Sequence, residues 1–223
     1  SRTEQSDLFH AIYGGHGDVP RAVLGAFDVV HARDVMHRAF ELAEQYQLPV
    51  LVLSDAYIAQ RRQIRDPASD RVIPAPRWRW TATDEPARFK LQAEPVVMPF
   101  RVPGTAGGTY LAAGIEHDEQ GRPSSDSNTH QAMSEKRFRK LRALDGRRDL
   151  FERRGRRDAA IGLIAWGSLA GVAYEALERA EAEGLDVQIL VPRLLYPVVE
   201  DVYREFFSGV RAGLVVEQSF QGQ

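Results

Sequence analysis

The fold is decided by one stretch, Ala160–Val191, which reads AIGLIAWGSLAGVAYEALERAEAEGLDVQILV. It contains an apolar run of strand length, Ala160–Ala165, and then the turn Trp166-Gly167-Ser168. A helical pattern, Leu169–Glu183, and a second apolar run, Val187–Val191, follow. A strand, a helix and a strand joined by short turns predict a parallel sheet with a right-handed crossover. We therefore expect an α/β fold in this part of the chain.

The same alternation of apolar runs and helical patterns continues on both sides of this stretch. The further predicted helices are Thr3–Tyr13, Ala32–Tyr46, 126–151 and Val198–Phe207, and the further predicted strands are Arg21–Leu24, Pro49–Ser54, Thr109–Gly114 and Gly213–Glu217. Continuous apolar strands fit a parallel sheet that is covered on both faces. We expect two parallel-sheet α/β units, residues 1–125 and 158–223, joined by a basic linker helix at 126–157.

Two segments depart from this alternation. Residues 136–157 hold eleven Lys and Arg against three Asp and Glu, a pattern typical of one solvated helix face, although a phosphate-binding stripe stays open. Residues 66–103 hold seven of the twelve prolines and the motif Trp78-Arg79-Trp80. Because a structureless loop of this length is unusual in a compact domain, we expect it to be functional or interfacial. We expect its tryptophans to anchor the loop, the alternative being that they stack on bases.

Composition excludes several classes of protein. The 223 residues carry 29 Lys and Arg against 31 Asp and Glu, and this balance argues against a dedicated nucleic-acid binder. The absence of Cys removes disulfides, thiolate metal sites and iron–sulfur ligation by this chain. No run approaches the roughly 18 apolar residues of a membrane helix. We predict a cytoplasmic protein without a membrane or nucleic-acid partner. The chain begins with Ser-Arg-Thr-Glu and no Met, so we expect a fragment or a processed subunit.

Common catalytic motifs are absent from the sequence. It has no Walker A motif, no HExxH and no nucleophile elbow, and Gly14-Gly15-His16-Gly17 follows a helix where a dinucleotide fingerprint would follow a strand. Four local features remain as candidates: Arg2 at a helix start, His16 between glycines, the loop Glu116–Glu119, and Ser168 before a helix. Each also has a purely structural interpretation: a surface arginine, a hydrogen-bonded turn histidine, a solvated acidic loop and a helix cap.

Several blocks in a fixed order resemble a known family. They are 2–8 (RTEQSDL), 13–21 (YGGHGDVPR), 39–50 (AFELAEQYQLPV), 53–55 (LSD), 114–119 (GIEHDE), 135–137 (EKR), 166–168 (WGS), 193–197 (RLLYP) and 216–218 (VEQ). In this order they resemble the alpha subunit of the 2-oxoacid:ferredoxin oxidoreductases, with the 2-oxoglutarate type most similar. The blocks extend over essentially the whole chain.

The resemblance implies a function and indicates which parts of the cofactor site belong to this chain and which to a beta subunit. Family members use thiamine diphosphate and magnesium to decarboxylate a 2-oxo acid, pass electrons to iron–sulfur clusters and ferredoxin, and transfer the acyl group to coenzyme A. The first unit would be thiamine-diphosphate-binding-like and the second transketolase C-terminal-like. A beta subunit would hold the magnesium–diphosphate end and a cluster, so no metal is expected in this chain. The family's substrate loop and cofactor-activating glutamate have no counterpart here, and we expect no turnover from this chain alone.

The resemblance also assigns site residues. Arg2 stands where the family places the arginine that holds the substrate carboxylate, and Thr3 is a weaker substrate-binding candidate. His117 and Asp118 lie in a block that the family places near the active site, and they are our candidates for catalytic roles. The resemblance names no cofactor-binding residue. Two alternatives stay open: a subunit specific for pyruvate or a branched-chain 2-oxo acid, and a non-catalytic α/β interaction module.

Overall fold

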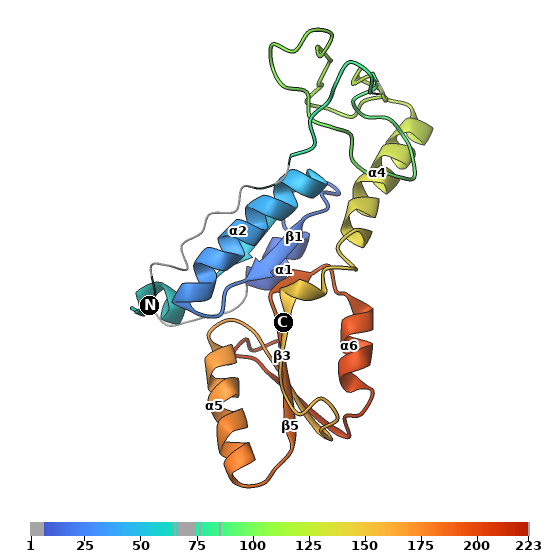
Figure 1. Cartoon of the computed structure of the whole chain (residues 1–223). Coiled ribbons are helices and arrows are strands. Elements are labelled where there is room, and N and C mark those ends of the chain that lie inside the picture. Colours follow the sequence, from blue (N-terminus) through green and yellow to red (C-terminus); the bar gives the residue numbers. More distant parts are fainter. Residues whose placement is uncertain (1–6, 65, 67–74, 76, 85, 223) are drawn as a thin grey trace.

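The computed structural model describes residues 7–64, 66, 75, 77–84 and 86–222 (Figure 1). The helices are α1 (Asp7–Tyr13), α2 (Val29–Tyr46), α3 (Ala56–Gln60), α4 (Ser127–Arg142), the 3-10 helix η2 (Arg148–Leu150), α5 (Leu169–Ala182) and α6 (Glu200–Phe207). The strands are β1 (Ala22–Gly25), β2 (Val50–Leu53), β3 (Phe151–Gly155), β4 (Ile161–Ala165), β5 (Val187–Pro192), β6 (Leu194–Tyr196) and β7 (Ala212–Val216). None of the helices within these ranges is long and apolar enough to cross a bilayer.

The strands form two sheets. The first has the order β2-β1-β6 and the second the order β3-β5-β4-β7. The central pairings β1–β2, β4–β5 and β4–β7 are parallel, which confirms the expected α/β class with parallel elements. Both sheets also carry an antiparallel edge strand, β6 against β1 and β3 against β5, which the sequence analysis did not predict.

The helix α2 shows how the sequence fixes the first unit. It begins after Asp28, whose carboxylate accepts a hydrogen bond from the His31 amide at 2.6 Å, and its C-cap is Gln47, which has a φ of 50°. Val35, Ala39 and Leu42 recur at helical spacing and are its buried residues. This face covers β1 and β2, so α2 lies on that sheet as a crossover connection should.

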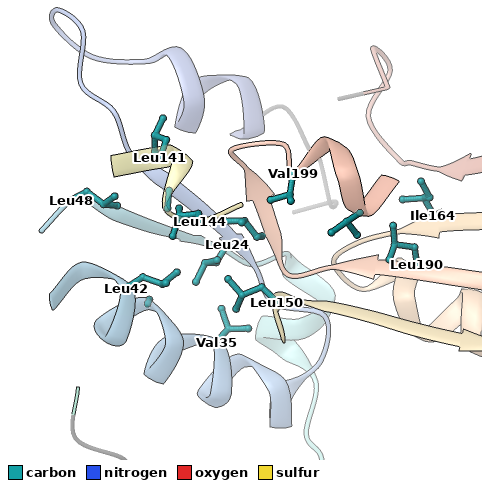
Figure 2. Close-up of a cluster of buried hydrophobic side chains, with 14 of the residues drawn as sticks. Leu24, Val35, Leu42, Leu48, Leu141, Leu144, Leu150, Ile164, Leu190 and Val199 are labelled. Carbon is teal, nitrogen blue, oxygen red and sulfur yellow. The ribbon is translucent and has the colours of Figure 1, made fainter. Parts of the chain in front are cut away.

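One hydrophobic cluster spans both sheets. It combines side chains of β1, α2, α4, η2, β4, β5, β6 and α6, including the fully buried Leu24, Leu144, Leu150 and Leu194. Figure 2 shows the cluster extending from the side chains of α2 to those of β4 and β5. A second cluster lies under α5, so α5 and α6 cover opposite faces of the second sheet (Figure 1).

The expected linker helix at 126–157 is wrong in its extent. Helix α4 ends at Arg142, and Phe151–Gly155 forms the edge strand β3. In β3 two consecutive arginines cover aromatic rings of different helices: Arg153 lies 5.5 Å from the Phe206 ring of α6, and Arg154 lies 3.8 Å from the Tyr174 ring of α5. Because the arginine stem is apolar and its guanidinium stacks on aromatic faces, a run of arginines can form a strand between two helical layers.

The segment between α3 and α4 is largely irregular where the structure describes it. The predicted strand Thr109–Gly114 does not form, and none of the strands in the described ranges pairs with these residues. Trp80 is buried, with the Arg101 guanidinium 3.8 Å from its ring, and its amide donates to the Phe100 carbonyl at 2.8 Å. Trp80 is thus held within the segment itself, whereas Trp78 is 47% exposed, and the expectation that the tryptophans pin this loop to the body of the protein stays a prediction.

Two glycines with a positive φ test how tightly β3 is packed. Gly155 has a φ of 78°, and an added Cβ would lie 2.2 Å from the Val187 carbonyl oxygen. Gly184 has a φ of 76° with nothing within 4 Å of its Cβ position. Gly184→Ala should therefore cost only the backbone strain of about 1–2 kcal/mol, and Gly155→Ala should cost at least about 2 kcal/mol more. Urea denaturation of the two variants measures the difference, and equal losses would contradict the packing described for β3.

Candidate functional site

The loops after β2 and β4 meet at one carboxylate. Asp55 follows β2 and caps α3, with its Oδ1 accepting from the Ile58 amide at 3.0 Å. Its Oδ2 accepts from the Ser168 amide at 2.8 Å. The carboxyl ends of parallel strands from both sheets are thus tied together, and in open α/β sheets ligands bind at this edge.

The turn after β4 is held against its surroundings by its tryptophan. Trp166 Nε1 donates to Glu217 Oε2 at 2.6 Å, and Glu217 directly follows β7. A Cβ at Gly25, where β1 ends, would lie 3.2 Å from the Trp166 ring, so the ring lies close against the backbone of β1. Beside the Trp166 ring is a cavity of about 30 Å³ that Leu53 and Asp55 also line, and it has the size of a water molecule.

A larger groove opens beside this turn. Two adjoining cavities of about 590 and 170 Å³ share the lining residues Tyr57, Arg61 and Ser168. Ser168 occupies the N-cap position of α5 but makes no side-chain capping bond, so the structural interpretation of Ser168 as a cap is wrong. The physical reason is its helical backbone (φ −61°, ψ −19°), whereas capping side chains belong to extended residues.

The groove has the chemistry to receive a polar or anionic group. The amides of the first turn of α5 lack partners within the helix, and the exposed Arg61 forms no ion pair with any residue that the structure describes. The sequence analysis missed Asp55 and Arg61 as site residues. An Asp that directly follows a parallel strand and precedes a helix was the available signal for Asp55.

His117 and Asp118 lie elsewhere. Their loop packs with the irregular segment at the end of the molecule opposite α5 (Figure 1), so the structure does not bring them to the groove. His117 Nδ1 donates to the Asp118 carbonyl at 2.8 Å, and its ring centroid lies 4.2 Å from that of Phe89. The Asp118 carboxylate accepts from the Gln120 and Arg122 amides, both at 2.9 Å, and so it holds its own loop.

Glu116 fastens this loop to α4. Its carboxylate pairs with the Arg137 guanidinium and lies 2.6 Å from His130 Nδ1. The hydrogen bonds from Arg137 outweigh partial burial and lower the pKa of Glu116 to about 2. The acidic loop is therefore not simply solvated, because its first residue is an ion-paired anchor.

The remaining sequence candidates have no described partner or no described structure. Arg2 and Thr3 lie outside the described residues. His16 is exposed, and within the described ranges its ring makes no hydrogen bond, so the interpretation of a hydrogen-bonded turn histidine is not supported.

The described residues do not provide a complete site for thiamine diphosphate. Within 7–64, 77–84, 86–222 and the described positions between them, no three His, Asp or Glu side chains converge to hold a metal ion. Magnesium that holds a diphosphate takes one or two carboxylates together with phosphate and water oxygens, so what these residues lack is a larger cluster of metal ligands.

The Glu116 anchor has a defined pH dependence. The pKa of the carboxyl is about 2 in the folded chain and near 4.5 when unfolded, so its stabilisation is complete above pH 4.5 and is lost as the pH falls toward 2. Glu116→Gln should destabilise the protein at pH 7, and the gap to the unmodified protein should close toward pH 2. Urea denaturation at several pH values across this range measures the difference in the free energy of unfolding. Glu175 forms an exposed ion pair with Arg179, so Glu175→Gln is a control whose stability should change little. A gap that does not depend on pH would contradict the anchor.

Comparisons with known proteins agree with this fold. The family described as pyruvate flavodoxin/ferredoxin oxidoreductase, thiamine diP-bdg, matches residues 1–136. The chain is 34% identical to the 2-oxoacid:ferredoxin oxidoreductase 2 alpha subunit of Aeropyrum pernix, over all of this chain and 35% of the relative. It is 30% identical to the 2-oxoglutarate synthase subunit KorA of Methanothermobacter marburgensis, over 96% of this chain and 57% of the relative.

A solved structure is also similar over the whole chain. It is the 2-oxoglutarate:ferredoxin oxidoreductase of Magnetococcus marinus with 2-oxoglutarate, coenzyme A and succinyl-CoA bound, with a TM-score of 0.88 and 38% identity. All of this chain is covered but only 39% of that chain, and the chain spans about a third of the length of the Aeropyrum relative. With the family match over residues 1–136, these similarities show that the chain belongs to the thiamine-diphosphate-binding family of the pyruvate flavodoxin/ferredoxin oxidoreductases.

Proposed function

We propose that this chain is part of the alpha subunit of a 2-oxoglutarate:ferredoxin oxidoreductase. The enzyme would decarboxylate 2-oxoglutarate oxidatively, transfer the acyl group to coenzyme A and pass the electrons to ferredoxin. The observation that carries the proposal is the similarity, at a TM-score of 0.88 over the whole chain, to an enzyme of that name. The generic name of the Aeropyrum relative keeps pyruvate and branched-chain 2-oxo acids as alternative substrates.

The proposal requires a second polypeptide. This chain has no Cys to ligate an iron–sulfur cluster, and its described residues offer no cluster of carboxylates for magnesium. We assign both the cluster and the magnesium–diphosphate end of thiamine diphosphate to a beta subunit. The groove beside Asp55 and Ser168 is an edge from which this chain could contribute to a shared site. A cytoplasmic location stays a prediction.

Arg2 and Thr3 are the proposed substrate-binding residues. A 2-oxo acid must be oriented by its carboxylate before its 2-oxo carbon can react, and a guanidinium binds a carboxylate through two parallel hydrogen bonds. Arg2 is placed by the resemblance at the position that serves this purpose, and Thr3 beside it could donate one further hydrogen bond.

His117 is the proposed proton-transfer residue, and Asp118 its positioning residue. Because His117 Nδ1 must donate its proton to the Asp118 carbonyl, a neutral ring presents Nε2 as the acceptor. The Asp118 carboxylate fixes the loop that supplies this carbonyl. Such a histidine can act on a substrate only where another chain or segment completes the site around it.

The proposed activity is tested on the full-length protein purified with its partner subunit. Reduction of a viologen dye should require 2-oxoglutarate and coenzyme A together. Activity with pyruvate or a branched-chain 2-oxo acid alone would replace the proposed substrate. Failure with every 2-oxo acid would favour the non-catalytic interaction module.

Arg2 has a prediction of its own. In the complete enzyme, Arg2→Ala should lower kcat/KM for 2-oxoglutarate roughly 30- to 1000-fold, because a charge-assisted pair with the substrate is lost. This change corresponds to a loss of about 2–4 kcal/mol of transition-state stabilisation. Arg179→Ala removes an exposed arginine on α5 and should leave kcat/KM unchanged. A loss of less than about threefold in the Arg2 variant would remove the residue from the proposed site.

A further inference from the structure

A cavity of about 410 Å³ lies between the C-terminal end of α2, the helix α4 and the segment 88–100. Its apolar walls include Leu48, Phe89, Val97, Met98 and Phe100. This volume falls within the range of small-molecule pockets, which are mostly apolar with a few placed polar groups. It shares no lining residue with the groove beside Ser168.

Three cations line this cavity. They are Arg88 of the irregular segment and Lys136 and Lys140 of α4. Lys136 is only 7% exposed. Arg88 donates to Gln47 Oε1 at 2.6 Å, while its Nε is buried and has no hydrogen-bond partner in the described part of the chain.

The lysines occupy positions that a core residue would normally take. Met133 and Leu141 are the other buried residues of α4, and Lys136 lies three residues after the first and five before the second. Lys140 is one turn beyond Lys136, and its ammonium donates to the Gln47 carbonyl at 2.7 Å. Gln47 is the C-cap of α2, and the C-terminal end of a helix favours a cation, so this contact is a sufficient structural reason for Lys140. No such contact explains Lys136, because its ammonium makes no hydrogen bond to any residue that the structure describes.

The positive charge of the cavity is only partly balanced. No carboxylate of the described residues lies within ion-pair distance of Lys136 or Lys140, and Arg137 is already paired with Glu116. Glu119 acts on Lys136 from a greater distance, and one of its oxygens accepts from the Leu91 amide at 2.5 Å. Burial, followed by the neighbouring cations, lowers the pKa of both lysines to about 8. Three cations against one carboxylate leave an excess of about two positive charges.

Lys136 is buried as a residue, yet its Nζ is not among the buried unpartnered atoms of the described residues, so the ammonium is open to the cavity and available to an anion. From the cavity, its three cations and the unpartnered Lys136, we propose that this site binds a phosphorylated small molecule. Its phosphoryl group would lie among Lys136, Lys140 and Arg88, and its apolar body against Phe89, Met98 and Phe100. A phosphate monoester carries close to two negative charges and several acceptor oxygens, which matches the excess, whereas a carboxylate would leave one cation unbalanced. The proposal concerns a cavity other than the groove of the proposed function.

The test measures protection of the lysines in the full-length protein with its partner subunits. Phenyl phosphate, inorganic phosphate and benzoate are the probes, and acylation of Lys136 and Lys140 by acetic anhydride is read by peptide mass spectrometry. Phenyl phosphate should slow acylation of Lys136 at least about tenfold, with inorganic phosphate weaker and benzoate weaker still. Calorimetric titration of phenyl phosphate gives the affinity independently.

Variants decide whether the cavity is the site. Lys136→Gln should weaken phenyl phosphate binding about tenfold or more, and Lys136→Arg should restore most of it. Arg142→Gln is the matched control, because Arg142 is an exposed cation on the same helix and does not line the cavity. Should Lys136→Gln fold poorly, the melting temperature of the Lys140→Gln variant should rise less with phenyl phosphate than that of the unmodified protein.

Three outcomes would overturn the proposal. The first is an equal loss of binding in Lys136→Gln and Arg142→Gln. The second is benzoate protecting as well as phenyl phosphate, since the cavity would then take a carboxylate such as an acidic side chain of another chain. The third is a Lys136 that is already shielded in the assembled protein without any probe, because another polypeptide would then fill the cavity.

Discussion

Arg193 is the point at which the two sheets become one structure. It is the single residue between β5 of the second sheet and β6 of the first. Its amide donates to the Leu150 carbonyl at 2.8 Å, and its carbonyl accepts from the Gly25 amide at 2.8 Å. Its guanidinium bonds Asp34 at 2.9 Å and Glu152 at 3.3 Å. Because these bonds link α2, η2 and strands of both sheets, the relative position of the two units is fixed by backbone pairing as well as by packing.

The edge that carries the groove depends on this junction. The pairing of β6 with β1 sets the position of the first sheet relative to the second. The hydrogen bond from the Ser168 amide to the Asp55 carboxylate then joins residues that are 113 positions apart. A shift of one residue in the pairing would turn every side chain of β6 to the opposite face and remove Leu194 from the shared core. Neither α/β unit alone supplies the groove, because Tyr57 and Arg61 come from the first and Ser168 from the second.

The sequence predicted the regular elements where local patterning and burial agree. The helices α2 and α5 and the strands β2, β4 and β5 lie within a few residues of their predicted bounds. The prediction failed for β3, where charge suggested a helix and arginine–aromatic stacking allows a strand instead. It also missed β6, whose three residues are too few to show a period. The meeting of Asp55 with Ser168 could not be predicted, since no local pattern encodes a contact between two sheets.

The basic run shows why charge counts alone mislead. Residues 136–157 suggested one solvated face, yet Lys136 shares the buried side of α4 with Met133 and Leu141. The spacing of three residues from Met133 would have placed Lys136 on the buried side of the helix, where a charge is expensive. Arg153, by contrast, is explained by its aromatic neighbour and by Gln188, to which it donates at 2.5 Å. A cation at a core position with no partner among the described residues calls for a binding explanation, and one with partners calls only for a structural explanation.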